Sequence, residues 1–151
     1  MRNKGDNNDF TEQRNAEVMD AYRRIFKIYG GIVDVKTLYA MVSFAPASRF
    51  FVSARQAYRV ISRMFNGGSI SNMRPANQRM YKEIYLKVRE ELSDGKGRMK
   101  HSPSAIRRAV TKIVRQPAPE MYIGTRQISF IISKEKIKCY EERKRRLRHC
   151  F

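Results

Sequence analysis

The chain has 151 residues, of which 42% are apolar and 30% are charged, and its formal net charge is +18. This apolar content is sufficient for a buried core, so we expect a folded protein. No apolar run approaches the roughly 18 residues of a membrane span, and the N-terminal residues lack the apolar stretch of a signal peptide. We therefore expect a cytoplasmic protein, and the large positive charge favours a polyanionic partner.

The positive charge is concentrated in particular parts of the chain. Residues 1–34 carry six basic and six acidic side chains, whereas residues 35–82 carry eight basic side chains and no acidic one. Residues 95–119 carry seven basic groups and again no acid, and residues 120–151 carry nine basic and four acidic groups. Because a solubilising surface normally intersperses both signs, we interpret the two acid-free segments as places where a negatively charged partner binds.

Helical periodicity in the first half of the chain predicts three helices, at about residues 10–29, 35–44 and 54–66. Asp9 with Glu12 and Ser53 with Gln56 have the spacing of capping boxes, which start the first and third helices. Asp34 is a candidate N-cap for the second helix. Glycine pairs follow the first and third helices and end them.

The second half of the chain predicts three more helices. Pro75 suits the first turn of a helix that a glycine-rich segment ends. Ser102 precedes a second helix, which Pro117 limits. Ile128 opens the last helix, which can continue through Tyr140 into the basic C-terminal tail, residues 141–151.

Two segments of the chain match each other at a constant offset of 71 residues. Residues 46–62 and 117–133 align without a gap, with identities between Pro46, Ala47, Arg55, Gln56, Ile61, Ser62 and Pro117, Ala118, Arg126, Gln127, Ile132, Ser133. A long helix and a short helix precede each copy. The match predicts an internal duplication, with units at about residues 10–66 and 75–140.

The expected fold is therefore mainly α, a single compact domain over residues 1–151 with about six helices in two repeated three-helix units. The extended pieces Arg49–Val52 and Glu120–Ile123 are equivalent under the duplication. They could pair as a short two-stranded β-ribbon across a pseudo-two-fold axis. Because two strands alone are marginal in water, the helices would provide the stability.

The strongest candidate site is a row of arginines on the predicted helix 54–66. Arg55, Arg59 and Arg63 are spaced at i, i+4 and i+8 and form one row about 12 Å long, opposite the apolar face. Like charges at this spacing repel, so an anion against the row would stabilise it. Arginine can grip a phosphate with two hydrogen bonds or read a guanine edge. The alternative is a solvated face, or salt bridges to the acids of the following helix, among them Glu83, Glu90, Glu91 and Asp94.

Two further basic clusters extend the candidate nucleic-acid interface. One surrounds the glycine-rich segment and the start of the fifth helix, with a flexible solvated loop as the alternative interpretation. The other lies in the C-terminal tail and is of a kind that binds phosphates without sequence preference. The full set of candidate residues is Arg49, Arg55, Arg59, Arg63, Lys96, Arg98, Lys100, Arg107, Arg108, Lys112, Arg143, Lys144, Arg145, Arg146 and Arg148.

Two structural alternatives concern how nucleic acid is contacted. The order short helix, connection, Arg-faced helix over residues 35–66 is that of a helix-turn-helix reader, but the connection 45–52 exceeds the usual turn of about three to four residues. Aromatic side chains could stack on unpaired bases, although most lie on apolar stripes and favour core packing.

The sequence argues against an enzyme. His101 and His149 are the only neutral-pH acid–base groups, and neither has a Ser, Cys or carboxylate at a meaningful spacing. Cys139 and Cys150 suggest neither a disulfide framework nor a zinc site, so we expect no metal and no cofactor. A small RNA-cleaving toxin that works with Arg, Lys and Tyr is the remaining enzymatic alternative.

The segment Pro46-Ala47-x-x-Phe50-Phe51-Val52-Ser53 and the basic ending Tyr140-Glu-x-Arg-Lys-Arg-Arg-Leu resemble short basic proteins of uncharacterised function carried by bacteriophages and mobile elements. The resemblance implies a phage or mobile-element setting, in the cytoplasm or in a virion, and it implies no site. We expect a nucleic-acid-binding protein, with DNA favoured over RNA. The alternatives are a structural or assembly protein that self-associates as a homo-oligomer or binds another protein, and a membrane-surface binder using basic amphipathic helices.

Overall fold

The computed structural model describes residues 10–93 and 102–149, and it is mainly helical, as the sequence predicts. Over these residues the helices are α1 (Thr11–Tyr29), α2 (Val35–Ser43), α3 (Ala54–Phe65), α4 (Pro75–Leu92), α5 (Pro103–Val114) and α6 (Thr125–His149). The boundaries agree with the predicted ranges to within a few residues, except that α6 begins three residues before Ile128.

Most of the predicted helix starts are confirmed at the level of individual hydrogen bonds. Asp34, Ser53 and Ser102 each accept, through a side-chain oxygen, the backbone N–H three residues later, at 3.0, 3.2 and 3.2 Å. These bonds satisfy one of the N–H groups that have no acceptor within the helix. Pro75 is the first residue of α4. Asp9 lies outside the described residues, and α1 begins without a side-chain cap.

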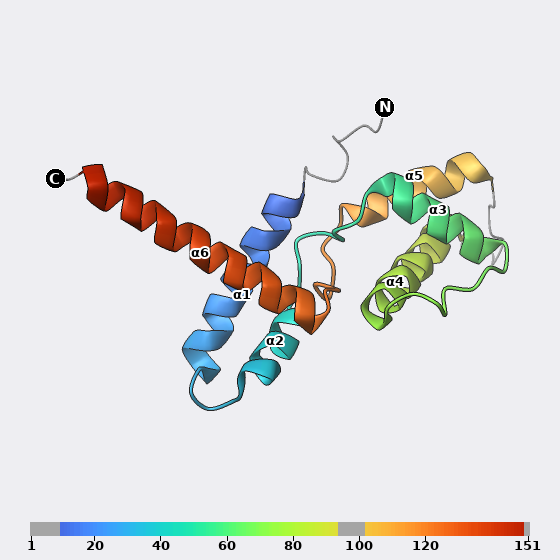
Figure 1. Ribbon diagram of the computed structural model, residues 1–151. Helices are drawn as coiled ribbons and strands as arrows, with labels where there is room; N and C mark the ends of the chain where they lie inside the picture. Colours follow the sequence, from blue (N-terminus) through green and yellow to red (C-terminus); the bar gives the residue numbers. More distant parts are fainter. Residues whose placement is uncertain (1–9, 94–101, 150–151) are drawn as a thin grey trace.

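The six helices pack in two groups of three, and the groups are not the ones that the sequence order suggests. Helices α1, α2 and α6 contact one another, and α3, α4 and α5 form the second group, beside the first (Figure 1). The third helix of each expected unit therefore packs on the first two helices of the other unit: α3 on α4 and α5, and α6 on α1 and α2. Because α2 and α3 lie in different groups, they do not form a helix-turn-helix pair, and that alternative is wrong.

The two segments between the groups cross at Ala47 and Ala118. The N–H of each alanine donates to the carbonyl of the other at 3.0 Å, which makes an isolated antiparallel bridge. The predicted ribbon between Arg49–Val52 and Glu120–Ile123 is wrong, because pairing occurs earlier in both segments and, over the described residues, does not extend into strands.

Helix ends prevent the bridge from extending. On one side, Ala45 and Gln116 donate their N–H groups to carbonyls three residues earlier, at 3.1 and 3.0 Å. On the other side, Phe50 donates its N–H to the last residue of α5 at 3.1 Å, and Met121 donates to the last residue of α2 at 3.2 Å. Each of these bonds has its counterpart 71 residues away. The register supports the predicted internal duplication, which stays a prediction.

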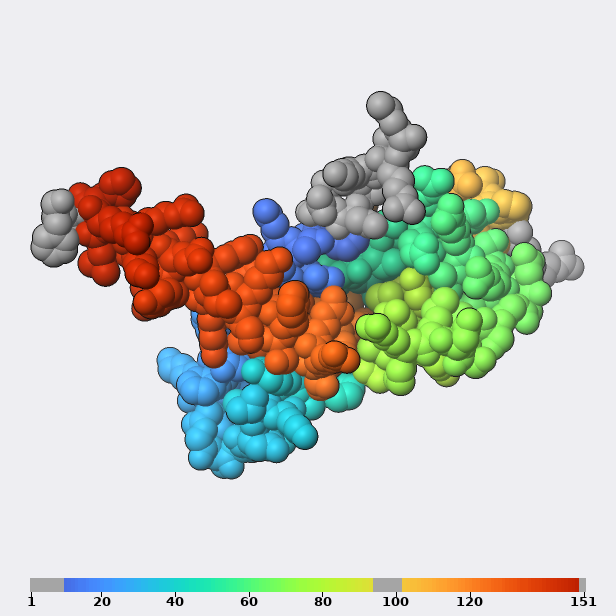
Figure 2. Space-filling model, in the orientation of Figure 1, coloured from blue at the N-terminus to red at the C-terminus, as the bar shows by residue number. Residues whose placement is uncertain are grey.

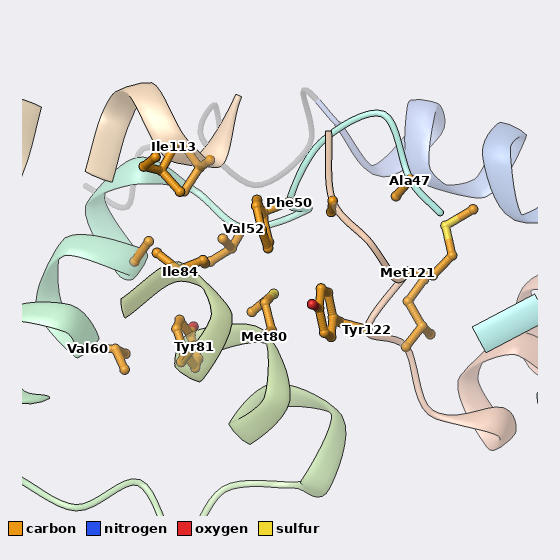
Figure 3. Packing of buried hydrophobic residues seen from close by; sticks show 14 of the residues in the cluster. Ala47, Phe50, Val52, Val60, Met80, Tyr81, Ile84, Ile113, Met121 and Tyr122 are labelled. Carbon is orange, nitrogen blue, oxygen red and sulfur yellow. The ribbon is translucent and has the colours of Figure 1, made fainter. Parts of the chain in front are cut away.

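One hydrophobic cluster runs through both groups and the crossing segments. Phe50 and Tyr122 stack at the centre, with ring centroids 5.9 Å apart and planes inclined by 12° (Figure 3). The buried faces of α3 and α6 also correspond at the 71-residue offset, since both helices bury their fourth, seventh and eighth residues: Ala57, Val60, Ile61 and Ile128, Ile131, Ile132. Burial of these side chains holds the two groups and their connections together.

Helix α6 extends well beyond the packed body (Figure 2). Its 25 residues span about 37 Å at the usual helical rise, and its buried residues all lie in the first third. The predicted C-terminal tail is thus helical as far as His149. Within the described ranges, no helix combines the length and the apolar character needed to cross a membrane.

Candidate nucleic-acid interface

Helix α3 presents the predicted arginine row on its exposed face. Ala57, Val60 and Ile61 are buried against α4 and α5, and Arg55, Arg59 and Arg63 are all exposed on the other side of the helix. This division follows from the helical period, since the apolar residues recur at intervals of three and four. The helix contains no acidic residue, so nothing within α3 offsets the three charges.

The arginine row has no ion-pair partner in the part of the chain that the structure describes. Glu91 of α4 is instead paired with Lys112 of α5, with its Oε1 2.7 Å from Nζ. Glu83 and Glu90 of α4 form no ion pair with the row. Asp94 lies outside the described residues. The alternative interpretation, in which salt bridges to α4 neutralise the row, therefore finds no support from Glu83, Glu90 or Glu91.

Helix α5 adds a fourth cation next to the row. The guanidinium carbon of Arg107 lies 4.8 Å from the ring centroid of Tyr58, a cation–π contact across the α3–α5 packing. Arg55, Tyr58 and Arg107 line a hollow of about 340 Å³, together with Ala54 and Thr111. Two guanidinium groups from different helices thus share one concave site, and the Tyr58 ring holds one of them in place.

The other predicted residues of the middle segment fall into different environments. Arg108 is exposed on α5, as a phosphate-contacting residue would be. Lys112 is less suited to that role than the sequence suggested, because its ammonium group is already paired with Glu91. Lys96, Arg98 and Lys100 lie outside the described residues.

Arg49 packs against the body of the protein. Its guanidinium carbon lies 5.0 Å from the Phe10 ring centroid, and its Nε donates to the carbonyl oxygen of Phe50 at 3.2 Å. Burial, and then the nearby charge of Arg115, lower the pKa of Arg49 below its usual value. Because the side chain is engaged and partly buried, Arg49 is less available to a phosphate than the exposed arginines of the α3 row.

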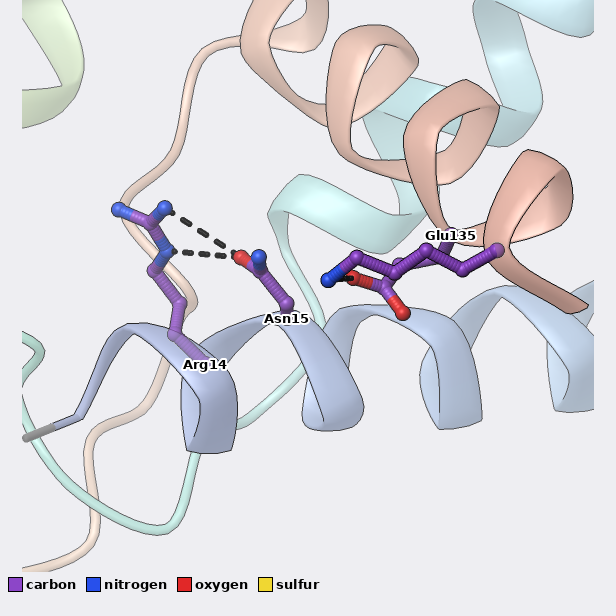
Figure 4. A network of polar contacts seen from close by, with 4 residues as sticks. Arg14, Asn15 and Glu135 are labelled. Atoms are coloured by element: carbon purple, nitrogen blue, oxygen red, sulfur yellow. Dashed lines mark hydrogen bonds and ion pairs between the residues drawn. The ribbon is translucent and has the colours of Figure 1, made fainter. Parts of the chain in front are cut away.

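The basic residues 143–148 lie at the far end of α6, away from α3 (Figure 1). All are exposed, and Lys144 Nζ lies 5.7 Å from the Tyr140 ring centroid. Nearer the body, Glu135 points from α6 toward α1 and pairs with Lys138 at 3.5 Å (Figure 4). Apart from Arg49, the predicted site residues that the structure describes therefore lie on two surfaces: the α3–α5 face, and the exposed end of α6.

The predicted aromatic roles also divide. Tyr81 is buried, and Tyr22, Tyr58 and Tyr85 are partly buried against the core, as core packing predicts. Phe26, on the apolar stripe of the first predicted helix, and Tyr140 are instead exposed, at 51% and 64%. The exposed aromatics lie on the group formed by α1, α2 and α6.

The described residues bring no set of acid–base or metal-ligating groups together. His149 lies exposed at the end of α6, and His101 is outside the described ranges. No group of three or more His, Cys, Asp or Glu side chains gathers in metal-binding geometry over residues 10–93 and 102–149. The buried polar side chain of Ser43 donates its Oγ hydrogen to the carbonyl oxygen of Ile123 at 2.6 Å, which is a structural bond.

Sequence reasoning did not single out three arginines at the junction of the two groups: Arg74, Arg79 and Arg126 line a hollow between α2, α4 and α6. One signal was present, since Arg126 corresponds to Arg55 in the 71-residue match. Spacing along the chain could not reveal the other two, because their proximity to Arg126 depends on how the groups pack.

No protein-family model, no curated protein and no solved structure matches this chain. The fold and the surface define it as a mainly helical protein with an exposed, acid-free cationic face on α3 and α5.

Proposed function

We propose that this protein binds nucleic acid, DNA in preference to RNA, through the cationic face of α3 and α5. The observation that carries the proposal is the row Arg55, Arg59 and Arg63, which is exposed and has no ion-pair partner among the described residues. Such a row is locally unfavourable until anions lie against it. Phosphates at intervals along a nucleic-acid backbone supply those anions, and guanidinium groups bind them in a bidentate manner.

The packing of α3 supports this assignment. Three buried residues fix the helix against α4 and α5, so the arginine row stands on a rigid base. Arg107, held over the Tyr58 ring, adds a charge at one end of the row. Because the backbone that carries the row is fixed by packing before binding, less backbone conformational entropy is lost when phosphates are contacted.

The test is fluorescence anisotropy with labelled duplex DNA, single-stranded DNA and RNA, using nuclease-treated protein over a series of salt concentrations. The logarithm of the affinity should fall with the logarithm of the salt concentration, by about 0.9 per duplex phosphate contacted. Replacing both Arg59 and Arg63 by glutamine should reduce that slope by about 2 and weaken binding. A matched control replaces Lys27 and Lys36, two exposed cations of the other helix group, by glutamine.

The proposal fails if no nucleic acid binds at low salt, or if the Arg59 and Arg63 double variant binds with the slope of the wild type. Equal loss in the control and the test variant would mean that net charge alone governs binding. In that case the α3 face would have no special role.

The exposed apolar side chains of the other group favour a second candidate function, in assembly. Large apolar residues are exposed around the α1–α2 connection and along α6, namely Phe26, Ile28, Ile32, Val35, Phe130, Ile137, Tyr140 and Leu147. Where such side chains gather into one patch, they often mark a protein contact. A phage or mobile-element structural protein that self-associates would use it. Sedimentation of the nuclease-treated protein would show concentration-dependent association if this is its role, and a monomer at all concentrations would exclude self-assembly.

A further inference from the structure

A second hollow lies where the two helix groups meet. Its volume is about 430 Å³, and it is bounded by the end of α2, the start of α4, the segment 122–124 and the start of α6. The starts of α6 and α4 adjoin on the face shown in Figure 2. Arg74, Arg79 and Arg126 line the hollow, and no acidic residue does. This is a concave site with three guanidinium groups from two helix groups.

The three arginines differ in how far they are already neutralised. Arg79 is engaged, since its Nε lies 3.3 Å from Oε2 of Glu120 and its guanidinium carbon lies 5.3 Å from the Phe44 ring centroid. Arg74 and Arg126 are exposed and take part in no ion pair within residues 10–93 and 102–149. The hollow therefore has two uncompensated positive charges beside one that is held in place.

The backbone at the start of α4 adds further donors. Ala76 and Asn77 line the hollow and belong to the first turn of α4, where N–H groups have no acceptor within the helix. The N-cap residue of α4, Arg74, makes no side-chain capping hydrogen bond to them. These N–H groups can donate to an anion that the arginines hold, although they would not define a site without those arginines.

The wall of the hollow also contains a strained residue. Tyr122 has a φ of 54°, the left-handed region that a bulky side chain rarely adopts, and no other non-glycine residue in the described ranges has a positive φ. Its ring is held by stacking on Phe50. Backbone strain of this kind is found most often at ligand sites, where the surrounding packing maintains it.

The hollow corresponds in part to the one on α3. Arg126, Thr125 and Ala40 line the junction hollow, and the residues 71 positions away, Arg55, Ala54 and Thr111, line the hollow beside Tyr58. In both places an arginine in the first turn of a helix faces the short helix of the same group. The junction hollow has more cations because the start of α4 closes one side of it.

We propose that the junction hollow binds the phosphate monoester of a nucleotide, either free or at the end of a nucleic-acid strand, with Arg74 and Arg126 gripping the phosphate oxygens. A phosphate monoester carries a charge of about −1.5 to −2 near neutral pH, which matches the two uncompensated guanidinium groups. An internal phosphodiester carries a single negative charge and would leave one of them unmatched. This site is separate from the α3–α5 face and does not depend on the function proposed for that face.

Phe44 indicates why a nucleotide is the expected ligand. Its side chain is 57% exposed at the hollow, and the guanidinium group of Arg79 lies over its ring. An exposed aromatic ring beside a phosphate site offers a surface on which a base can stack. Phe44, Arg74 and Arg126 line the same hollow of about 430 Å³, so one nucleotide can contact the ring with its base and the two arginines with its phosphate.

The experiment uses the full chain labelled with nitrogen-15 and follows backbone amide shifts during titration with AMP, adenosine and inorganic phosphate. A second arm compares the anisotropy of single-stranded DNA with a 5′-phosphate and with a 5′-hydroxyl. The test variant replaces both Arg74 and Arg126 by glutamine. The control replaces Lys36 and Lys134, two exposed cations outside the hollow, by glutamine, so that both variants lose two positive charges. Circular dichroism checks that both variants fold.

AMP should bind more tightly than adenosine and shift the amides of Ala76 and Asn77, and the test variant should lose about tenfold or more in AMP affinity while the control does not. If a strand end is the source, the 5′-phosphate strand should bind more tightly than the 5′-hydroxyl strand, and the test variant should lose that preference. The proposal is wrong if AMP binds no better than adenosine and the 5′-phosphate gives no advantage. It is also wrong if the test variant behaves as the control does. Binding of 5′-hydroxyl duplexes through α3 is expected to persist in the test variant, which separates the two proposals.

Discussion

Helix α3 and the distal part of α6 are both strongly basic, yet they present their charge in different ways. α3 packs on α4 and α5 and buries three residues, whereas α6 beyond Ile132 buries none of its described side chains. A helix without packing on other elements is marginal in water, so the distal end of α6 must rely on local contacts such as that of Lys144 with the Tyr140 ring. Similar charge density therefore does not mean equal binding, because only α3 carries its cations on a helix that packing fixes before a ligand arrives.

The largest expected effect concerns the core beneath the α3 row. Ile61 is fully buried, so Ile61→Ala should lower the free energy of unfolding by about 2–5 kcal/mol through lost burial and a residual cavity. Ile137→Ala, on the exposed part of α6, should change it by less than about 0.5 kcal/mol. Guanidinium chloride denaturation measures both. Similar losses in the two variants would contradict the difference in packing between α3 and α6.

The next effect separates the two basic surfaces directly. Arg59→Glu with Arg63→Glu should weaken duplex DNA binding by about 10- to 100-fold, since each reversal removes a charged contact and adds repulsion. Arg145→Glu with Arg146→Glu makes the same change in net charge on the unpacked end of α6, and we expect a smaller loss there. Anisotropy at a fixed salt concentration compares the variants. A larger loss from the α6 variant would reverse the assigned roles of the two surfaces.

The burial of Tyr122 at the junction of the two groups can be tested through the dependence of folding stability on pH. Burial, and then the charges of Glu120 and Glu83, raise its pKa to about 12. Because the folded-state pKa lies above the unfolded value of about 10, the contribution to stability is complete below pH 10 and is lost as the pH rises toward 12. Stability should fall over this range in the wild type, and less steeply in Tyr122→Phe. Denaturant midpoints measured between pH 10 and pH 12 give the change of stability with pH for each protein. The same change in the wild type and in Tyr122→Phe would contradict the prediction.

The smallest expected effect is that of the ion pair between Lys112 and Glu91. Both side chains are at least 40% exposed, so the pair should contribute only about 0.2–1 kcal/mol to folding despite its 2.7 Å separation. A double-mutant cycle with Lys112→Ala and Glu91→Ala measures the coupling energy. A coupling well above this range would mean that the α4–α5 contact depends on electrostatics, rather than on the apolar faces of the two helices.

The sequence predicted the helices well because the signals that start and end them are local. The capping oxygens of Asp34, Ser53 and Ser102 each act on an N–H three residues away, and Pro75 acts at its own position. The exposed arginine row on α3 follows from the same short-range period. Each of these features depends on residues within one or two helical turns.

The packing of the helices could not be read in the same way. Periodicity shows which face of α3 is buried, but it does not show that the partners are α4 and α5 instead of α2. The ribbon was placed too late in both segments because Phe50 and Met121 use their N–H groups on the ends of the opposite short helices. The pairing of Lys112 with Glu91 and the meeting of Arg74 with Arg126 likewise depend on tertiary contacts between distant parts of the chain.

Because α3 packs with α4 and α5, and α6 packs with α1 and α2, the two groups differ in how far apart their helices lie along the chain. Helices α3, α4 and α5 are consecutive, so their group can form from local contacts between residues 54 and 114. The group of α1, α2 and α6 must close a loop that runs from Ser43 to Thr125, and the entropy cost of closure increases with loop length. During synthesis, α1 and α2 would have to wait for α6 to leave the ribosome. We therefore expect the α3 group to fold first, and the arginine face to exist before the rest of the molecule is complete.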